Sequence, residues 1–300
     1  MTNRVLGLVG PTAAGKSTLG LEVAARVGGE VVNADSMQLY RGMDIGTAKV
    51  SLAERRGVPH HLLDVWHVTE TASVAAYQRM ARDCLDGLLA RGITPIVVGG
   101  SGLYVRAALD GMTFPGTDPA LRARLEAELA VLGAEALHVR LAHRDPPAAA
   151  AILPSNGRRI VRALEVGELR GSYPATLPAY APTAGGYDVV YLGLDVPVAE
   201  LDSRIEQRVE TMWQRGLVEE VRALAGAGLG SGVTASRALG YAQVLDLLAG
   251  RCTEEEARAA TVQATRRFAR RQRSWFRRDP RLCWLRTPTV SAALAVTVTR

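Results

Sequence analysis

The chain has 300 residues, 48% of them hydrophobic, and a formal net charge of +6. This length and hydrophobic content can bury one large core or two smaller ones, while the positive charge alone leaves a nucleic-acid partner open. The three cysteines lie far apart in the sequence and form no Cys-x-x-Cys pair, which argues against a disulfide framework and structural zinc. We expect Cys84 to be buried in a helix. No apolar run reaches membrane-spanning length and the first strand is predicted near residue 5, so we expect a cytoplasmic protein without membrane contact.

Residues 5–28 predict a phosphate-binding site. An apolar run at 5–9 leads into the sequence GPTAAGKS, and an amphipathic segment follows as far as Gly28. A strand before this pattern and a helix after it are its specific context, because loop N–H groups and the helix N-terminus then converge on an anion. We expect a diphosphate to bind at the loop, formed by Gly10, Pro11, Thr12, Ala13, Ala14, Gly15, Lys16 and Ser17.

Lysine is almost absent from the chain, whose only lysines are Lys16 in this loop and Lys49 in the sequence GTAK. Lysine is a compact point charge that arginine does not replace at a tight phosphate site. We therefore expect Lys16 to reach the terminal phosphate oxygens and the Ser17 hydroxyl to hold Mg²⁺. The same rarity favours a functional role for Lys49.

The order of the predicted elements indicates the α/β class, with a P-loop NTPase-like parallel sheet core and a helical insertion domain. Residues 1–113 and 187–300 form the core, with strands at 5–9, 30–34, 93–98, 189–195 and 282–285 and helices at 18–28 and 73–91. Residues 114–186 form the insertion. Its helices begin after Asp118, Asp145 and Asn156, and a Pro/Gly/Tyr-rich stretch at 171–187 predicts a mobile exit.

Asp35 follows the second predicted strand, at the sheet edge where open α/β folds bind ligands. Its carboxylate can act as a general base or can cap a helix, and Gln38 resembles a capping-box partner. The strand at 93–98 ends in Gly-Gly-Ser without an acidic residue. This argues against ATP hydrolysis and for group transfer to a bound acceptor, unless the acidic partner lies elsewhere.

Two further regions leave alternatives open. The adjacent His60 and His61 point apart on an extended chain, so we expect a loop packed under the substrate and no metal site. Arg158, Arg159 and Arg162 have helical spacing, with Ile160, Leu164 and Gly167 able to face inward. Residues 266–278 interleave arginines with aromatic residues, which suits either nucleic-acid contact or a solvated helix face whose aromatic stripe is buried.

The succession of motifs closely resembles the bacterial tRNA dimethylallyltransferases, which prenylate the adenosine 3′ of the anticodon. The matching segments span residues 5 to about 284 in the family's order. They are GPTAAGKS from Gly10, DSMQLY from Asp35, GMDIGTAK from Gly42, PHHLLD from Pro59, VVGGSGLY from Val97, RRIVRALE from Arg158, GLVEEV from Gly216, SRALGY from Ser236 and RRFARRQRSWF from Arg266.

The resemblance implies a monomer that uses dimethylallyl diphosphate and Mg²⁺ and grips the tRNA anticodon stem-loop with its insertion; it leaves ATP binding at the P-loop open. It implies catalytic roles for Asp35, Ser101 and Lys16. Serine stands at positions 17 and 101 where the family often has threonine, which keeps both hydroxyls. The implied tRNA contacts are Asp35, Ser36, Met37, Gln38, Ser101, Ala123, Arg159, Ile160, Val161, Arg162, Ala163, Arg237, Ala238, Leu239, Gly240, Tyr241 and Ala242. An adenylate isopentenyltransferase and a P-loop kinase of a small metabolite remain the alternatives.

Overall fold

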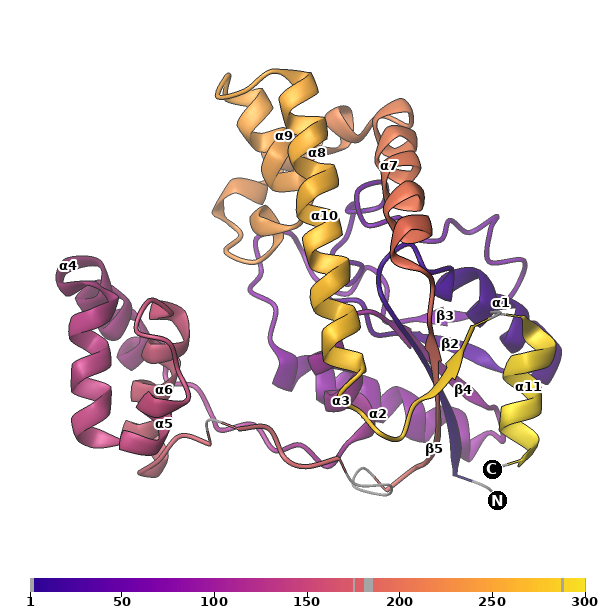
Figure 1. The fold of residues 1–300 in the computed structure, drawn as a ribbon, viewed down its shortest axis with the longest axis horizontal. Coiled ribbons are helices and arrows are strands. Elements are labelled where there is room, and N and C mark those ends of the chain that lie inside the picture. Colours follow the sequence, from indigo (N-terminus) through magenta and orange to yellow (C-terminus); the bar gives the residue numbers. More distant parts are fainter. Residues whose placement is uncertain (1–2, 175, 181–185, 287–288, 300) are drawn as a thin grey trace. The chain divides into compact units, whose positions relative to one another are not determined.

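The computed structural model describes residues 3–174, 176–180, 186–286 and 289–299. The chain divides into two compact units, of which unit 1 comprises Met1–Gly111 and Tyr180–Arg300 and unit 2 comprises Met112–Ala179 (Figure 1). The domain boundaries predicted from the sequence lie between residues 113 and 114 and between residues 186 and 187. The mobile exit predicted for residues 171–187 lies partly outside the described residues.

Unit 1 is built on a six-stranded sheet whose paired strands are all parallel, in the order β3-β2-β4-β1-β5-β6. The central β1 pairs with β4 and β5, so that Leu8 lies opposite both Val98 and Leu192. The parallel α/β prediction is confirmed. The strands are β1 Arg4–Val9, β2 Glu30–Asn33, β3 His60–His61, β4 Pro95–Gly99, β5 Asp188–Leu194 and β6 Cys283–Leu285.

The helices of unit 1 follow the predicted signals. Gly28 ends the first of them in a left-handed conformation, and Ser73 caps the second by accepting a hydrogen bond from the Ala76 N–H. The helices are α1 Lys16–Val27, α2 Val74–Ala90, α3 Gly102–Leu109, α7 Val198–Gln214, α8 Leu217–Gly226, α9 Tyr241–Leu248, α10 Glu254–Phe276 and α11 Val290–Thr299, with short 3₁₀ turns at Leu229–Ser231 and Ala235–Arg237.

Helices pack closely on both faces of the sheet because glycines stand at the contacts (Figure 1). A Cβ at Gly20 of α1 would lie 2.7 Å from the Val98 side chain of β4. On the other face, a Cβ at Gly7 of β1 would lie 3.3 Å from Leu109 of α3. The loops that leave the C-terminal ends of the strands are thereby held on a rigid base.

Unit 2 consists of α4 Pro119–Arg144, α5 Pro146–Ala150 and α6 Gly157–Arg170. The predicted helix starts are confirmed, since Asp118, Asp145 and Asn156 each accept hydrogen bonds from N–H groups of the helix that follows. Helix α4 contains one break, at Gly133, whose φ is 81°. The core of unit 2 is apolar and includes Leu125, Leu137, Leu141, Ile160 and Leu164.

Cys84, Cys252 and Cys283 are free cysteines, and each is half-buried. Cys84 lies on helix α2, as expected, but it is half-buried where a buried residue was expected. Burial raises the pKa of its thiol to about 11. Across the described ranges, we find no helix with the length and apolarity needed to cross a membrane.

Candidate active site

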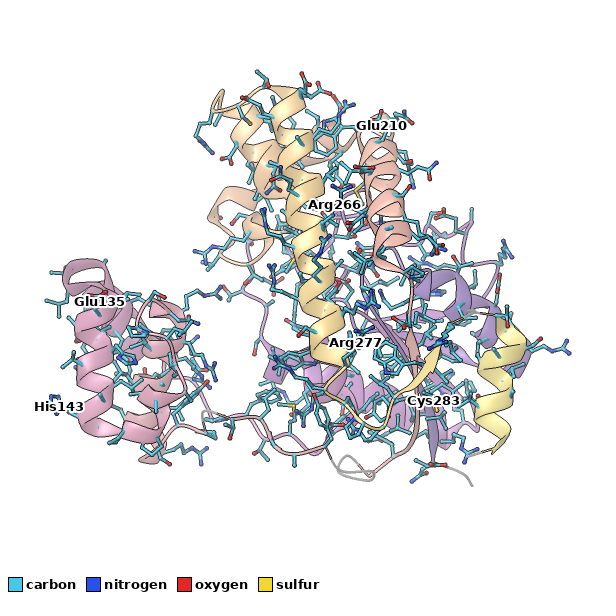
Figure 2. The ribbon with its side chains drawn as sticks, viewed as in Figure 1. Glu135, His143, Glu210, Arg266, Arg277 and Cys283 are labelled. Carbon is cyan, nitrogen blue, oxygen red and sulfur yellow. The ribbon has the colours of Figure 1, made fainter. Side chains whose placement is uncertain are left out.

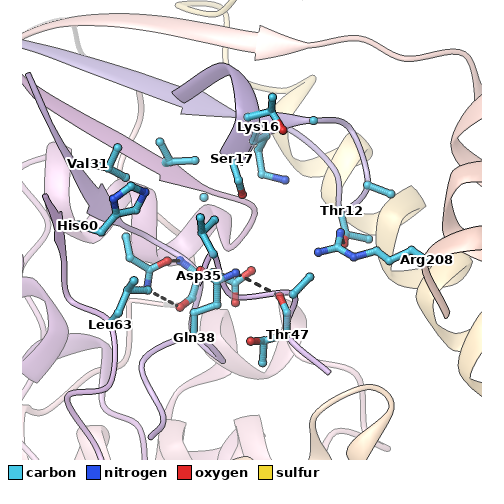
Figure 3. Close-up of a pocket in the computed structure, with 18 of the residues that line it drawn as sticks. Thr12, Lys16, Ser17, Val31, Asp35, Gln38, Thr47, His60, Leu63 and Arg208 are labelled. Atoms are coloured by element: carbon cyan, nitrogen blue, oxygen red, sulfur yellow. Dashed lines mark hydrogen bonds between the residues drawn. The ribbon is translucent and has the colours of Figure 1, made fainter. Parts of the chain in front are cut away.

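A cavity of about 330 Å³ opens where β1, β2 and β4 end (Figure 3). It brings together the P-loop, the segment after β2 and side chains from α7 and α10, which lie more than 160 residues further along the chain. Its polar lining includes Thr12, Lys16, Ser17, Asp35, Gln38, Thr47, His60, Arg204, Arg208 and Gln272.

The P-loop has the backbone shape of an anion site. Gly15 has a φ of 91°, and Ala13, unusually for a residue with a side chain, has a φ of 61°. No side chain caps α1. The N–H groups of its first turn are therefore available to an anion, with the helix dipole adding to their attraction.

Lys16 lies in the cavity, as predicted, and its Nζ donates to the Pro11 carbonyl over 2.7 Å. Burial lowers the pKa of Lys16 to about 8; the neighbouring Asp35 acts in the opposite direction, and Arg208 lowers it further. A bound anion would oppose this penalty, because nearby negative charge favours the protonated ammonium.

Sequence reasoning missed two arginines of α7 that face the same loop. Arg208 donates through Nη1 to the Thr12 hydroxyl over 3.1 Å, and burial lowers its pKa. Arg204 approaches the Ala13 carbonyl at 3.5 Å and also pairs with Glu200. Their four-residue spacing on a helix was a visible signal. Nothing in the sequence indicated that α7 packs against the P-loop.

Asp35 stands in a turn and begins no helix, so the helix-cap interpretation was wrong. Its Oδ1 accepts the Met37 N–H over 3.0 Å, and its own N–H donates to Asn33 Oδ1 over 2.9 Å. The predicted capping role of Gln38 was also wrong, since its Nε2 donates to the Thr47 carbonyl over 3.1 Å. These bonds fix a carboxylate in the cavity close enough to Lys16 to affect its pKa.

Ser101 follows β4 and reaches the segment that carries Asp35. Its Oγ accepts the Ser36 N–H over 3.3 Å and lies 3.3 Å from the Ser36 hydroxyl. The loops after β2 and β4 are therefore joined by the two serines. This placement brings Ser101 and Asp35, which are distant in sequence, to one side of the cavity.

Lys49, for which a functional role was predicted, does not line the cavity and is buried in a cluster of protein oxygens. Its Nζ donates to the Tyr40 carbonyl over 2.8 Å and to one oxygen each of Asp44 and Asp64 over 2.6 Å. Three converging oxygens suit a compact ammonium. The neighbouring Thr47 and Ala48 line the cavity instead.

His60 and His61 form β3, where a loop was expected, because this segment pairs with β2. His60 lines the cavity, and burial lowers its pKa, which favours the neutral imidazole. His61 makes a 2.5 Å contact with Glu30. Within the part of the chain described, no group of three or more His, Cys, Asp or Glu side chains is placed to hold a metal ion.

In unit 2, only part of the segment 159–163 can present side chains to a ligand. Ile160, Val161 and Ala163 are buried in the unit's core. Arg162 donates to the carbonyls of Pro115 and Gly116 and pairs with Glu165, which occupies its guanidinium. Arg159 is half-buried, Arg158 is exposed, and Ala123 is exposed on α4. Gly167, expected to face inward, is only half-buried.

The segment 237–242 of unit 1 likewise contains both exposed and buried residues. Arg237 is exposed, while Ala238, Gly240 and Tyr241 are buried, and Leu239 and Ala242 lie between these extremes. The Tyr241 hydroxyl donates to Glu220 over 2.5 Å. The buried residues of this segment shape the backbone and do not offer free side chains.

Comparison with known proteins agrees with this geometry. Residues 38–279 match the family model described as IPP transferase. A protein of Streptomyces griseus named tRNA dimethylallyltransferase is 66% identical over 283 residues, covering 94% of this chain and 90% of the relative. A protein of the same name from Parafrankia is 65% identical over 292 residues, covering 97% and 90%.

Solved structures give the same result. The tRNA isopentenylpyrophosphate transferase of Bacillus halodurans has a TM-score of 0.72 and 38% identity, covering 99% of this chain and 95% of that one. The corresponding transferase of Staphylococcus epidermidis has a TM-score of 0.73 and 30% identity, with 99% and 98% covered. The fold, the cavity and these matches together show that the chain belongs to the IPP transferase family.

Proposed function

We propose that this protein is a tRNA dimethylallyltransferase, which moves the dimethylallyl group of dimethylallyl diphosphate to the exocyclic amine of the adenosine 3′ of the anticodon. One observation carries the proposal: the P-loop cavity is lined by two half-buried cations, Lys16 and Arg208, together with the carboxylate of Asp35. The cations suit a diphosphate leaving group, and the carboxylate suits an amine that must lose a proton.

The P-loop acts on the leaving group in this proposal. As the allylic carbon–oxygen bond breaks, negative charge accumulates on the departing diphosphate. Lys16, Arg208 and the N–H groups at the start of α1 stabilise that charge, because the fold already holds them around the cavity before the substrate binds. The same phosphate-binding shape leaves room for ATP phosphates at the loop.

The residues present also fit Mg²⁺. The Ser17 hydroxyl lines the cavity and makes no hydrogen bond to another side chain or carbonyl among the described residues. Magnesium in phosphate sites is commonly held by one or two protein oxygens plus phosphate oxygens and waters. Ser17 would hold the ion, which would supply additional positive charge to the diphosphate.

Asp35 serves as general base for the acceptor. The adenine amine attacks the allylic carbon, forming a carbon–nitrogen bond as the carbon–oxygen bond breaks, and its proton passes to the Asp35 carboxylate. Ser101 holds Ser36 next to that carboxylate. The adenine must leave its stack to reach the cavity, which costs little in an anticodon loop.

Helix α10 supplies a surface for RNA. One row of its arginines is neutralised: Arg266, Arg270, Arg273 and Arg277 pair with Glu206, Asp202 and Asp195. Figure 2 labels Arg266 and Arg277 of this row on α10. The next row, Arg267, Arg271 and Arg278, is exposed and forms no ion pair within the described parts of the chain. The half-buried Phe268 and Trp275 flank it, and Phe276 is buried. Basic residues beside partly exposed aromatics suit an RNA backbone with unstacked bases.

The exposed row favours tRNA over the two alternatives. A free adenine nucleotide or a small metabolite would occupy the cavity without needing Arg267 and Arg271. In the helical unit, Arg158 and Arg159 provide a further basic site for the anticodon stem. The proposal has the protein act as a monomer in the cytoplasm, together with its tRNA substrate.

The test is incubation of the protein with dimethylallyl diphosphate, Mg²⁺ and one of two acceptors, unmodified tRNA or AMP, followed by mass spectrometry of the nucleosides. We expect dimethylallyl-adenosine at the position 3′ of the anticodon and none from AMP. Product from AMP alone would support the adenylate isopentenyltransferase, and label transferred from γ-labelled ATP would support a kinase.

A further inference from the structure

Gln272 is a buried polar side chain of α10 that joins two loops of the active site. Its Oε1 accepts the Thr12 N–H of the P-loop over 2.8 Å, and its Nε2 donates to the Gly100 carbonyl over 2.9 Å. The side chain is 6% exposed. Thr12 also receives the Arg208 hydrogen bond, and Gly100 directly precedes Ser101.

The two bonds fix the orientation of the amide. A backbone N–H can only donate and a carbonyl can only accept, so the oxygen of Gln272 must face Thr12 and the nitrogen must face Gly100. Among the side chains close in size, glutamate cannot donate when ionised and leucine can do neither. Glutamate would keep the acceptor for Thr12 but leave the Gly100 carbonyl without its donor, whereas leucine would leave both backbone groups without a buried partner.

The loop after β4 fits tightly against this part of α10. A Cβ at Gly100 would lie 2.4 Å from Gln272 Nε2, and a Cβ at Gly102 would lie 2.1 Å from the Trp275 indole. The backbone on both sides of Ser101 therefore rests directly on two α10 side chains. A change in the Gln272 contact must move Ser101 or strain the loop.

We propose that Gln272 is a positioning residue that sets the distance between the leaving-group site and the acceptor site. The inference rests on the proposed transfer reaction. Through Thr12 the amide holds the P-loop, and through Gly100 it holds Ser101, which in turn holds Ser36 beside Asp35. Alignment of the attacking amine with the allylic carbon depends on that distance, and errors near 1 Å cost about 10²-fold in rate.

The test compares Gln272→Glu with Gln263→Glu, which makes the same change at an exposed position of the same helix. We expect Gln272→Glu, with both substrates saturating, to slow single-turnover transfer about 10²-fold while the Kd of tRNA changes by less than about threefold; the new carboxylate also lines the cavity and repels the diphosphate, so donor affinity falls as well, but by less than the rate. Gln263→Glu should match the wild type. If Gln272→Glu does not fold, as judged by circular dichroism, the same measurements on Gln272→Asn decide, because asparagine keeps the amide but is one methylene too short.

A double-variant cycle with Ser101→Ala separates positioning from general damage. If Gln272 acts through the Ser101 loop, Gln272→Glu should slow the Ser101→Ala protein by much less than it slows the wild type. Additive losses, equal losses in rate and binding, or a wild-type rate in Gln272→Glu would each overturn the inference. A wild-type protein that transfers no dimethylallyl group to tRNA would instead overturn the proposed function.

Discussion

The Glu220 carboxylate accepts the Tyr241 hydroxyl over 2.5 Å while it also binds the loop that leads to the active site. Its two oxygens take the N–H groups of Asp44, Ile45 and Gly46 over 2.7–3.2 Å. One side chain of α8 thus joins the segment 237–242 to the loop that carries Thr47. The loop is close-packed there, since a Cβ at Gly46 would lie 2.4 Å from the Tyr241 ring.

Glu220→Gln should destabilise the fold by roughly 1–3 kcal/mol, because the amide nitrogen cannot accept and leaves backbone N–H groups without a partner. The adjacent Glu219→Gln is the matched control. Glu219 has a side chain that is 69% exposed and a 3.5 Å pair with Arg222, so its removal should change stability by less than about 0.5 kcal/mol. Urea unfolding of both variants measures the difference, and equal midpoints would show that the Glu220 cluster adds no stability.

Diphosphate binding should weaken as the pH rises through about 8. The protonated Lys16 attracts the anion, and its pKa is lowered from 10.5 to about 8, so the charge is present below that pH and lost above it. Above the pKa, affinity should fall by up to about tenfold per pH unit. Calorimetric titration of inorganic diphosphate between about pH 6.5 and about pH 9.5 gives the curve.

Lys16→Met supplies the control for this pH dependence. The variant should bind diphosphate weakly at every pH in that range and show no midpoint near 8, because the titrating ammonium is gone. Lys16→Arg should also bind poorly, since guanidinium keeps the charge but not the compact shape. A wild-type midpoint that persists in Lys16→Met would assign the titration to another group.

Asp35→Asn should slow the single-turnover chemical step about 10²- to 10⁴-fold, the usual range for removal of a general base. Binding of tRNA and of the donor should stay close to wild type, because asparagine keeps the Oδ1 acceptor that holds the Met37 N–H. Rapid quenching with saturating substrates measures the step. A decrease below about fivefold would reduce Asp35 to an element of the turn.

The structure confirms several predictions that depended on local pattern, although the helix cap considered for Asp35 was wrong. Gly28 as a helix stop and Asp118 as a helix cap are read from a few neighbouring residues, and each stands in the expected place. Arg208 and Gln272 were missed because their partner Thr12 lies 196 and 260 residues away in the chain. Their roles exist only once α7 and α10 pack beside the P-loop.

Lys49 shows that the rarity of a residue type does not locate a ligand site. The rarity of lysine did mark two positions that need a compact ammonium, but only Lys16 faces the cavity, whereas Lys49 is enclosed by Tyr40, Asp44 and Asp64. Composition can indicate which chemistry a position needs. It cannot indicate whether the oxygens around that position belong to a ligand or to the protein.

Lys49→Met should therefore lower stability and leave the chemistry largely intact. Removal of the ammonium leaves two carboxylates and a buried carbonyl without their shared donor, at a cost of about 1–3 kcal/mol. Thermal unfolding measures the loss of stability, and diphosphate titration below the melting transition measures whether binding is retained. A stable variant that no longer binds diphosphate would restore the functional assignment of Lys49.

Arg267→Gln and Arg271→Gln combined should weaken tRNA binding and reduce its salt dependence. Removing one arginine–phosphate interaction lowers the slope of log affinity against log salt by roughly 0.7–0.9, so the slope of the double variant should fall by between about one and two units. Donor affinity should not change, since neither residue lines the cavity as described.

The matched control removes the same charge from Arg26 and Arg91, which lie at the C-terminal ends of α1 and α2, before β2 and β4 begin. That is the end of the sheet away from the cavity, so tRNA affinity and its salt slope should stay at wild-type values. Titration of tRNA against both double variants at several salt concentrations compares their affinities and salt slopes. Equal decreases in both double variants would mean that net charge alone attracts the RNA, and unchanged binding in the α10 variant would leave its exposed row as a solvated helix face.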